Sequence, residues 1–229
     1  MSKKFGKRGS EVNPNNRFSK YAYERTHEEG LDLPPDEDAG RTEYVDVFPK
    51  TVVNKVTSPD VGMDFSLNPY QGCEHGCVYC YARNSHEYWG YSAGTDFERK
   101  VLVKKNAADL LRKKLDSPRW IPKAIALSGN TDCYQPIERK LQITRSLLEV
   151  FREYRHPVGM ITKNALVLRD LDILKDLASD GLVKVNLSIT TLDEDLRRHM
   201  EPRTATIKQR LNALEKLVEA GVPTGVMMA

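Results

Sequence analysis

From Thr42 onward, short apolar runs typical of β-strands alternate with longer segments whose apolar residues recur at helical spacing. Units of this kind imply parallel strands, because a crossover helix has to return the chain to the same end of the sheet, and such crossovers are right-handed. The sequence therefore predicts an α/β fold, built as a (β/α) barrel or part of one. We expect strands at residues 44–48, 51–56, 124–127, 158–162, 183–189 and 223–228.

Four helices are expected between these strands, at residues 106–115, 136–154, 169–178 and 207–218. Asn106 is a favourable N-cap residue, and Pro136 suits the first turn of a helix because its missing N–H would have no partner there. Gly221 is expected to end the last of the four helices.

Residues 1–41 are rich in glycine, asparagine, serine, proline and charge, and they show no sustained apolar period. A segment of this composition buries too little apolar surface to fold by itself. We predict a flexible, charged N-terminal extension at residues 1–41, followed by the core domain at residues 42–229. The first 25 residues are mainly basic and suit contact with phosphate groups, although a solvated tail explains them without a partner.

The chain has 229 residues, with 35 basic and 32 acidic side chains and a formal net charge of +3. No apolar run approaches the ~18 residues that a membrane-spanning helix needs. The first residues lack the apolar segment of a secretory signal. We therefore expect a cytoplasmic protein without membrane contact. The small positive excess is compatible with a nucleic-acid partner but does not by itself indicate one.

Polar residues gather just after the predicted strands, and ligands in parallel α/β folds bind at the carboxyl ends of the strands. These ends meet at one edge of the sheet, so the polar segments are expected to face a single opening. The segments are residues 73–80, 128–133, 162–164 and 188–190.

Three of the four cysteines, Cys73, Cys77 and Cys80, follow the spacing C-x3-C-x2-C. In a reducing compartment such a cluster binds metal more often than it forms disulfides. Three thiolates at this spacing suit one face of a 4Fe–4S cluster, and Gly72 and Gly76 allow the backbone to approach it closely. The fourth iron would then have no protein ligand and would be open to a small molecule.

A zinc site is the alternative, with Cys133, His75 or His86 as the fourth ligand. Closed zinc sites usually pair their cysteines in two separated C-x2-4-C knuckles, whereas Cys133 lies far along the chain with no second ligand beside it. Ligand softness and spacing therefore favour the iron–sulfur cluster.

The motif Cys73-x-x-x-Cys77-x-Tyr79-Cys80 resembles the signature of the radical S-adenosylmethionine (SAM) superfamily. Further segments, in the same order, are similar to its spore photoproduct lyase-like branch, often described as DNA repair photolyase-like. They are Asn68-Pro69-Tyr70, residues 72–83, Thr131-Asp132, residues 134–136, Thr162-Lys163 and Glu201-Pro202. The resemblance covers about residues 42–229 and implies a (β/α)6 TIM-like barrel. Residues 223–229 correspond to the fifth core strand, so a barrel truncated after that strand is expected.

The resemblance implies that the open iron binds the amino and carboxylate groups of SAM. The reduced cluster would cleave SAM to methionine and a 5′-deoxyadenosyl radical, which abstracts a hydrogen atom from a substrate. An external one-electron reductant would supply the electron. The reaction would be lyase-like or of the DNA repair photolyase type.

The same resemblance assigns roles to individual residues. The cluster ligands would be Cys73, Cys77 and Cys80. The SAM contacts would be Tyr79 at the adenine, Thr131 and Asp132 at the amino group, Lys163 at the carboxylate, and Ser188 at the ribose or carboxylate. A loop lysine and a capping hydroxyl are the structural alternatives for Lys163 and Ser188.

One departure from the branch concerns the cysteine that spore photoproduct lyase uses as a hydrogen-atom donor. Gly129 stands at the equivalent position here, so the expectation of thymine-dimer repair is weakened. Cys133 is then either a displaced donor, and in that sense a catalytic residue, or a small buried filler.

Two functions are compatible with the sequence. The first is a radical SAM enzyme acting on an unidentified substrate, with nucleic acid as a candidate. The second is a non-catalytic, metal-stabilised nucleic-acid-binding module, in which the basic extension and an aromatic cluster hold the nucleic acid. The same aromatic residues would equally serve to cover the iron–sulfur cluster; they are Tyr81, Tyr88, Trp89 and Tyr91.

Overall fold

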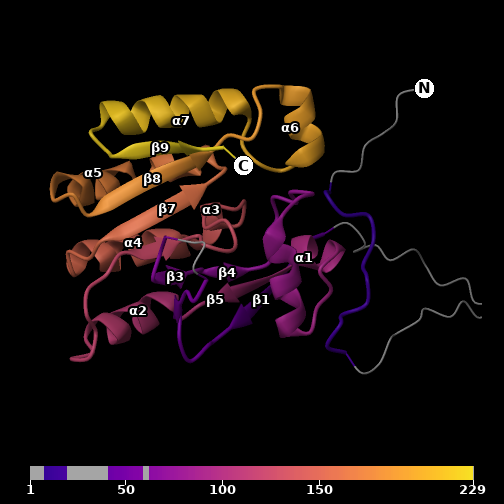
Figure 1. Cartoon of the computed structure of the whole chain (residues 1–229), viewed down its shortest axis with the longest axis horizontal. Coiled ribbons are helices and arrows are strands. Elements are labelled where there is room, and N and C mark those ends of the chain that lie inside the picture. Colours follow the sequence, from indigo (N-terminus) through magenta and orange to yellow (C-terminus); the bar gives the residue numbers. More distant parts are fainter. Residues whose placement is uncertain (1–7, 20–40, 59–61, 229) are drawn as a thin grey trace, which may run out of the picture.

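The structure is a computed structural model that describes residues 8–19, 41–58 and 62–228, and every structural statement below refers to these residues. Its largest element is a six-stranded sheet with the order β2-β3-β6-β7-β8-β9 (Figure 1). The antiparallel pair β2 and β3 lies at one edge, and all other neighbours are parallel. The strands are β2 (Val53–Lys55), β3 (Phe65–Leu67), β6 (Ile125–Leu127), β7 (Val158–Thr162), β8 (Val183–Ser188) and β9 (Thr224–Met227).

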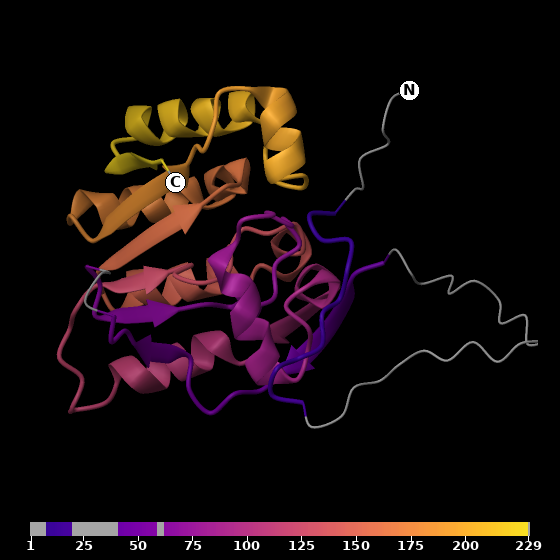
Figure 2. The ribbon, with the colours of Figure 1, turned by 45° about the vertical axis from the view of Figure 1, so that its right-hand side comes forward.

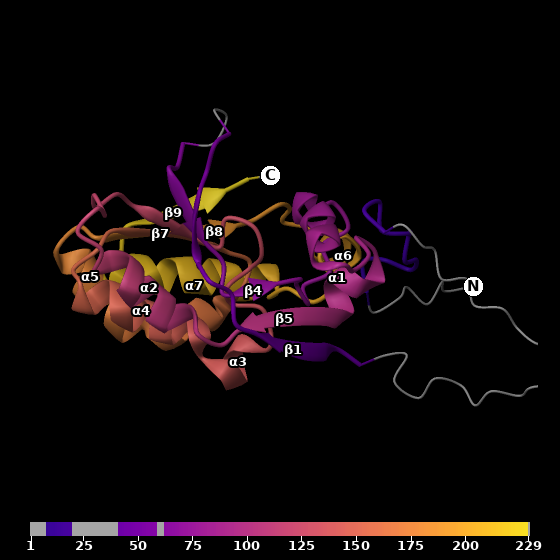
Figure 3. The same cartoon turned by 90° about the horizontal axis from the view of Figure 1, so that it is seen from below.

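Four helices lie on one side of this sheet (Figure 3). They are α2 (Ala107–Leu115), α4 (Ile143–Glu153), α5 (Leu171–Ser179) and α7 (Ile207–Glu219). Their apolar faces share one core with the strands, in which Leu127, Phe151, Leu174 and Leu187 are fully buried. Burial of each such side chain contributes roughly 1.5–3 kcal/mol relative to exposure, so this layered core fixes the strand ends in place.

A second, three-stranded sheet lies beside the first and has the order β1-β5-β4 (Figure 2). Its strands are β1 (Glu43–Val47), β5 (Lys100–Lys104) and β4 (Tyr70–Gln71). The short helical segments η1 (Tyr81–Trp89) and α1 (Thr95–Arg99) complete this part of the fold. The predicted strand at residues 44–48 thus forms, but in this second sheet and not in the barrel-like sheet.

The predicted α/β fold with parallel strands is confirmed, and the six-stranded sheet corresponds to a partial barrel. The strand predicted at residues 51–56 is shorter and antiparallel. The sequence pattern missed β3, β5 and α6 (Glu194–Met200). β3 has only three residues, Phe-Ser-Leu, a run too short for its alternation to identify a strand.

The single helix predicted at residues 136–154 is wrong. Two helices form there, α3 (Glu138–Leu141) and α4, separated by Gln142 in the left-handed conformation with φ 52°. The buried Glu138 explains the break, because its carboxylate accepts a hydrogen bond from the Thr144 N–H at 3.1 Å and so caps the start of α4. Asn106 does precede α2, but its side chain donates to the Pro49 carbonyl instead of capping the helix.

Residues 8–19 run along η1 and α1 (Figure 1). The Thr95 N–H donates to the Val12 carbonyl at 3.1 Å, the Gly9 N–H donates to Glu98 Oε2 at 3.1 Å, and Arg17 pairs with Glu87 at 2.8 Å. This part of the predicted extension is therefore hydrogen-bonded to the core, unlike the flexible segment that composition indicates. Residues 1–7 and 20–40 lie outside the described residues. Among the described helices, none has the length and apolar character needed to cross a membrane.

Candidate cofactor site

The loop that carries the three cysteines follows β4 and depends on two glycines. Gly72 and Gly76 have φ values of 83° and 67°, which L side chains rarely adopt. A Cβ atom on Gly72 would lie 2.8 Å from the Lys100 carbonyl oxygen, and one on Gly76 would lie 2.7 Å from Glu98 Oε2. Only glycine fits at both positions, and so the backbone folds tightly enough to bring the three cysteines together.

A buried ion pair supports this loop from behind. Glu98 is fully buried and pairs with Arg83 at 2.6 Å. Arg83 also donates to the Cys77 carbonyl at 2.9 Å, while the Cys73 N–H donates to the Phe97 carbonyl at 2.8 Å. A charge-assisted pair in a water-poor environment is strong, so the loop is held rigidly against α1.

A cavity of about 240 Å³ opens between this loop and the carboxyl ends of β6, β7 and β8. The structure brings together there every residue that the sequence assigned to the cluster or to SAM. These residues are Cys73, Cys77, Cys80, Tyr79, Thr131, Asp132, Lys163 and Ser188. The segments come from four separate parts of the chain, as the rule of strand ends predicts.

The four cysteines are free thiols, and none is in a disulfide. Burial raises the pKa of Cys73 well above its usual range, raises that of Cys77 to about 12, and raises that of Cys80. A metal group that binds these three cysteines as thiolates must therefore displace the protons of their thiols. Within the described residues, no three His, Cys, Asp or Glu side chains are arranged to hold a single metal ion.

Of the side chains considered as a fourth zinc ligand, His75 is held by two other side chains, and His86 and Cys133 lie outside the cavity. His75 lies between Asp132, with Nδ1 3.3 Å from Oδ2, and Asn164, with Nε2 3.4 Å from Nδ2. His86 stacks on Tyr91 at a centroid distance of 5.2 Å. Cys133 is fully buried in the main hydrophobic core and does not line the cavity. This position of Cys133 favours a buried filler over a displaced hydrogen donor.

Asp132 is almost fully buried, and its carboxylate is held by the protein itself. Oδ1 accepts from the Thr162 hydroxyl at 2.7 Å, and Oδ2 accepts from the Lys163 N–H at 2.7 Å and faces His75. Burial opposes ionisation, but His75 and these donors outweigh it and lower the pKa of Asp132 to about 2. Asp132 is thus an ionised residue that positions His75 and the Lys163 loop as well as facing the cavity.

Lys163 and Tyr79 face each other across the cavity, with Lys163 Nζ 5.8 Å from the centre of the Tyr79 ring. Thr131 donates its hydroxyl proton to the Tyr70 carbonyl at 2.7 Å. Ser188 is the last residue of β8 and is buried. Its backbone carbonyl accepts from Arg210 at 2.9 Å, so the strand end and the serine are held from behind.

A buried ion pair that the sequence pattern did not indicate supports Tyr79. Glu201 and Arg210 are each about 1% exposed and lie 2.5 Å apart. Glu201 also accepts hydrogen bonds from the Tyr79 and Thr190 hydroxyls. Burial opposes ionisation of Glu201, but Arg210 and the two hydroxyls lower its pKa. Glu201-Pro202 was part of the family resemblance, whereas Arg210 reads as an ordinary charged residue of a helix and gave no signal.

His86 makes the stability of this region sensitive to pH. It is fully buried between Tyr91 and Phe97, and burial lowers its pKa from 6.5 to about 4. The unfolded chain therefore binds a proton that the folded chain does not, and stability is lost as the pH falls from about 6.5 towards 4. We expect about 2 kcal/mol of this loss at pH 5, and His86→Phe should remove it. Urea unfolding at pH 7 and pH 5 measures the difference. An equal loss in both proteins would show that other groups cause it.

The fold and the site together define a class of protein, an α/β partial barrel with a cavity lined by three cysteines at the carboxyl ends of its strands. The sequence model of the radical SAM superfamily matches residues 67–229. The chain belongs to the radical SAM superfamily, and the resemblance predicted from the cysteine motif is confirmed.

Relatives of similar sequence occur in distant organisms. The chain is 35% identical over 187 residues to the uncharacterized protein Rv2578c of Mycobacterium tuberculosis, covering 81% of this chain and 55% of that protein. It is 31% identical over 182 residues to the uncharacterized protein MJ0683 of Methanocaldococcus jannaschii, covering 80% of this chain and 65% of that protein. The chain thus spans between half and two thirds of the length of these relatives.

Spore photoproduct lyase has a similar fold. Its structure in complex with dinucleoside spore photoproduct matches with a TM-score of 0.58 and 20% identity, covering 81% of this chain and 51% of that chain. A variant of that enzyme with bound AdoMet and dinucleoside spore photoproduct matches with the same TM-score and 18% identity. At this level of identity the likeness concerns the fold alone.

Proposed function

We propose that this protein is a radical SAM enzyme in which Cys73, Cys77 and Cys80 bind a 4Fe–4S cluster and the adjoining cavity binds SAM. The observation that carries the proposal is the convergence of the three cysteines and the strand-end residues on one cavity. When bound and reduced by an external one-electron donor, the cluster would supply the electron that cleaves SAM to a 5′-deoxyadenosyl radical.

The residues present fit such a cluster. Three sulfurs line the cavity, the His75 ring beside them is held by Asp132 and Asn164, and neither His86 nor Cys133 lines the cavity. Gly72 and Gly76 leave room where a Cβ atom would force the loop outward. The donor set is therefore three thiolates and an open position, which is the arrangement that a small molecule bound to the cluster requires.

The protein's own residues would bind and orient SAM. Lys163 supplies a positive charge suited to the methionine carboxylate, and the ionised Asp132, which lines the same cavity, suits the ammonium group. The Tyr79 ring is a stacking surface for adenine, and Glu201 holds its hydroxyl. Ser188 and Thr131 add polar groups at the ends of β8 and after β6.

We further propose that the substrate carries a planar ring, with a nucleic-acid base as the candidate. Tyr81 lines the cavity and is 76% exposed, and Tyr88 and Trp89 are exposed on the same helical segment. Exposed aromatic rings beside a site stack on bases at roughly 1–3 kcal/mol each. Spore photoproduct lyase, which shares the fold, has been solved with a dinucleoside ligand.

The proposed role of Lys163 predicts a loss of SAM binding without loss of the cluster. Lys163→Met should weaken SAM binding roughly 10–100-fold, because a hydrogen bond to a charged group is worth about 1.5–3 kcal/mol. Lys163→Arg keeps the charge and should recover part of the affinity. Calorimetric titration of the reconstituted protein with SAM gives the affinity, and iron analysis gives the cluster content.

The matched control is Lys184→Met, which removes an exposed lysine on β8 away from the cavity. It should bind SAM as the unmodified protein does. An unchanged affinity in Lys163→Met would contradict the proposed carboxylate contact.

Absence of 5′-deoxyadenosine from the unmodified, reconstituted protein with dithionite and SAM would overturn the enzyme assignment and favour the metal-stabilised binding module.

A further inference from the structure

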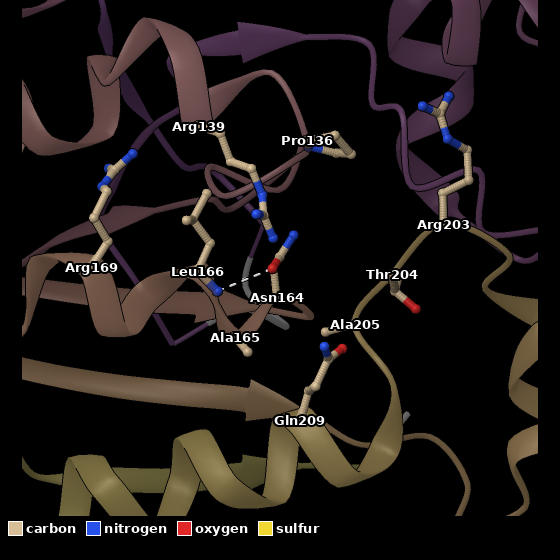
Figure 4. A pocket seen from close by; sticks show the side chains of 10 residues that line it. All are labelled: Pro136, Arg139, Asn164, Ala165, Leu166, Arg169, Arg203, Thr204, Ala205 and Gln209. Carbon is tan, nitrogen blue, oxygen red and sulfur yellow. Dashed lines mark hydrogen bonds between the residues drawn. The ribbon is translucent and has the colours of Figure 1, made fainter.

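A second cavity, of about 430 Å³, is lined by residues from separate parts of the chain (Figure 4). It is bounded by α3, the residues after β7, the segment before α7 and the first turn of α7. Its lining has no aspartate or glutamate. The polar residues that line it are Arg139, Arg169, Arg203, Asn164, Thr204 and Gln209.

Arg139 is the cation that is available to a ligand. Its side chain extends from α3 towards Asn164 (Figure 4), and it has no hydrogen bond or ion pair in the part of the chain that the structure describes. Arg169 is turned to Glu138 and Asp170 and is neutralised by them. Arg203 is partly exposed and has a single, longer ion pair, with Glu74 at 3.3 Å. A free guanidinium in a concave surface without carboxylates attracts an anion.

Two amide side chains present their donor ends to the same cavity. Gln209 Oε1 accepts from the Thr206 N–H at 3.0 Å as part of a capping box, which leaves its Nε2 group for the cavity. Asn164 Oδ1 accepts from the Leu166 N–H at 3.0 Å, and its Nδ2 group lies 3.4 Å from His75 Nε2, which leaves its second N–H for the cavity. Backbone N–H groups at the starts of two helical segments thus occupy the side-chain oxygens of Gln209 and Asn164, and side-chain N–H groups remain as donors. The N-terminus of α7 adds a partial positive charge at the same place.

We propose that this cavity binds a phosphate group of a nucleotide or of a nucleic-acid strand. The Arg139 guanidinium and the Asn164 and Gln209 amides, which come from three separate parts of the chain, offer N–H donors to an oxyanion. The cavity has room for more than one phosphate, so the group would belong to a larger ligand. That ligand is distinct from SAM, which carries no phosphate.

This site is separate from the cofactor cavity but adjoins it. Lys163 lines the cofactor cavity and its neighbour Asn164 lines the second one. The proposal is independent of the cofactor assignment, because none of Arg139, Lys140 and Gln209 lines the cofactor cavity.

Two variants test the proposal by calorimetric titration with inorganic phosphate at low ionic strength. Arg139→Gln should weaken phosphate binding about tenfold or more, as expected for loss of a charge-assisted hydrogen bond. Gln209→Glu should abolish it, because the carboxylate keeps the capping-box acceptor while replacing a donor by a negative charge. Lys140→Gln removes an exposed charge from the same helix, outside the cavity, and should bind phosphate normally.

Adenosine monophosphate and a short single-stranded oligonucleotide distinguish the two sources of phosphate. If adenosine monophosphate binds more tightly than inorganic phosphate and the oligonucleotide does not, the ligand is a free nucleotide. If the oligonucleotide binds more tightly than inorganic phosphate, and this binding is lost in Gln209→Glu, the ligand is a nucleic-acid strand. Absence of phosphate binding in the unmodified protein overturns the proposal. Equal weakening by Arg139→Gln and Lys140→Gln also overturns it, since that result reflects overall charge. Thermal unfolding of each variant confirms that it is folded.

Discussion

Replacing Cys77 by alanine should abolish both iron binding and the formation of 5′-deoxyadenosine. Cys77 is one of three sulfurs on a single cavity, and the fourth cysteine, Cys133, lies in the hydrophobic core outside that cavity. Even partners of metal ligands are worth roughly 10–100-fold in affinity or activity, so loss of a ligand should exceed about 100-fold. Iron and sulfide analysis after anaerobic reconstitution, with chromatography of the SAM cleavage products, measures both effects.

Cys133→Ala is the matched control, because it removes a cysteine that lies in the hydrophobic core outside the cavity. It should retain iron and sulfide and lose only a little stability. Two results would refute the assignment of the three cysteines. One is a Cys77→Ala variant that keeps its cluster, and the other is an unmodified protein that binds one zinc and no sulfide.

The second large effect concerns stability, and it comes from the buried pair of Glu201 and Arg210. Both side chains are about 1% exposed, so removing one partner leaves an uncompensated charge in the interior. Breaking such a pair costs roughly 3–5 kcal/mol. We expect that penalty for Glu201→Gln and for Arg210→Met alone, measured by urea unfolding. Arg112→Met, which breaks an exposed pair with Glu153, should cost at most about 1 kcal/mol.

The double variant Glu201→Gln, Arg210→Met separates the pair from the general effect of substitution. It leaves no isolated charge, so it should be clearly more stable than the sum of the two single effects, by roughly 0.5–3 kcal/mol. Additive losses would mean that the two charges act independently. Glu201→Gln should also loosen Tyr79 and weaken SAM binding, because the carboxylate holds the tyrosine hydroxyl.

Local patterns predicted the parallel sheet and most of the site. Strands such as Val158–Thr162 and Val183–Ser188 have regular burial patterns, and the helices between them have clear apolar faces. Residues after parallel strands have to meet at one edge, so the sequence alone was enough to place Asp132, Lys163 and Ser188 together. The cysteine spacing indicated the family, and the match to the model of the radical SAM superfamily confirms it.

The features that escaped prediction depend on contacts between distant parts of the chain. The break at Gln142 follows from a buried carboxylate, Glu138, that the sequence pattern treats as a surface charge of a helix. Arg210 looks like one more polar residue of α7 until its position against Glu201 is known. The donors of the second cavity likewise converge only in three dimensions, from α3, the end of β7 and α7.

The contacts of residues 8–19 bear on how variants of this protein should be designed. A boundary drawn from composition would begin a shortened protein at Thr42 and so delete the backbone partners of Thr95 and Glu98. Glu98 lies directly beneath Gly76 and pairs with Arg83, which holds the Cys77 carbonyl. A shortened form would therefore lose contacts that support the cysteine loop. A low iron content in that form would reflect the deletion of residues 8–19 and not a defect in the three cysteines.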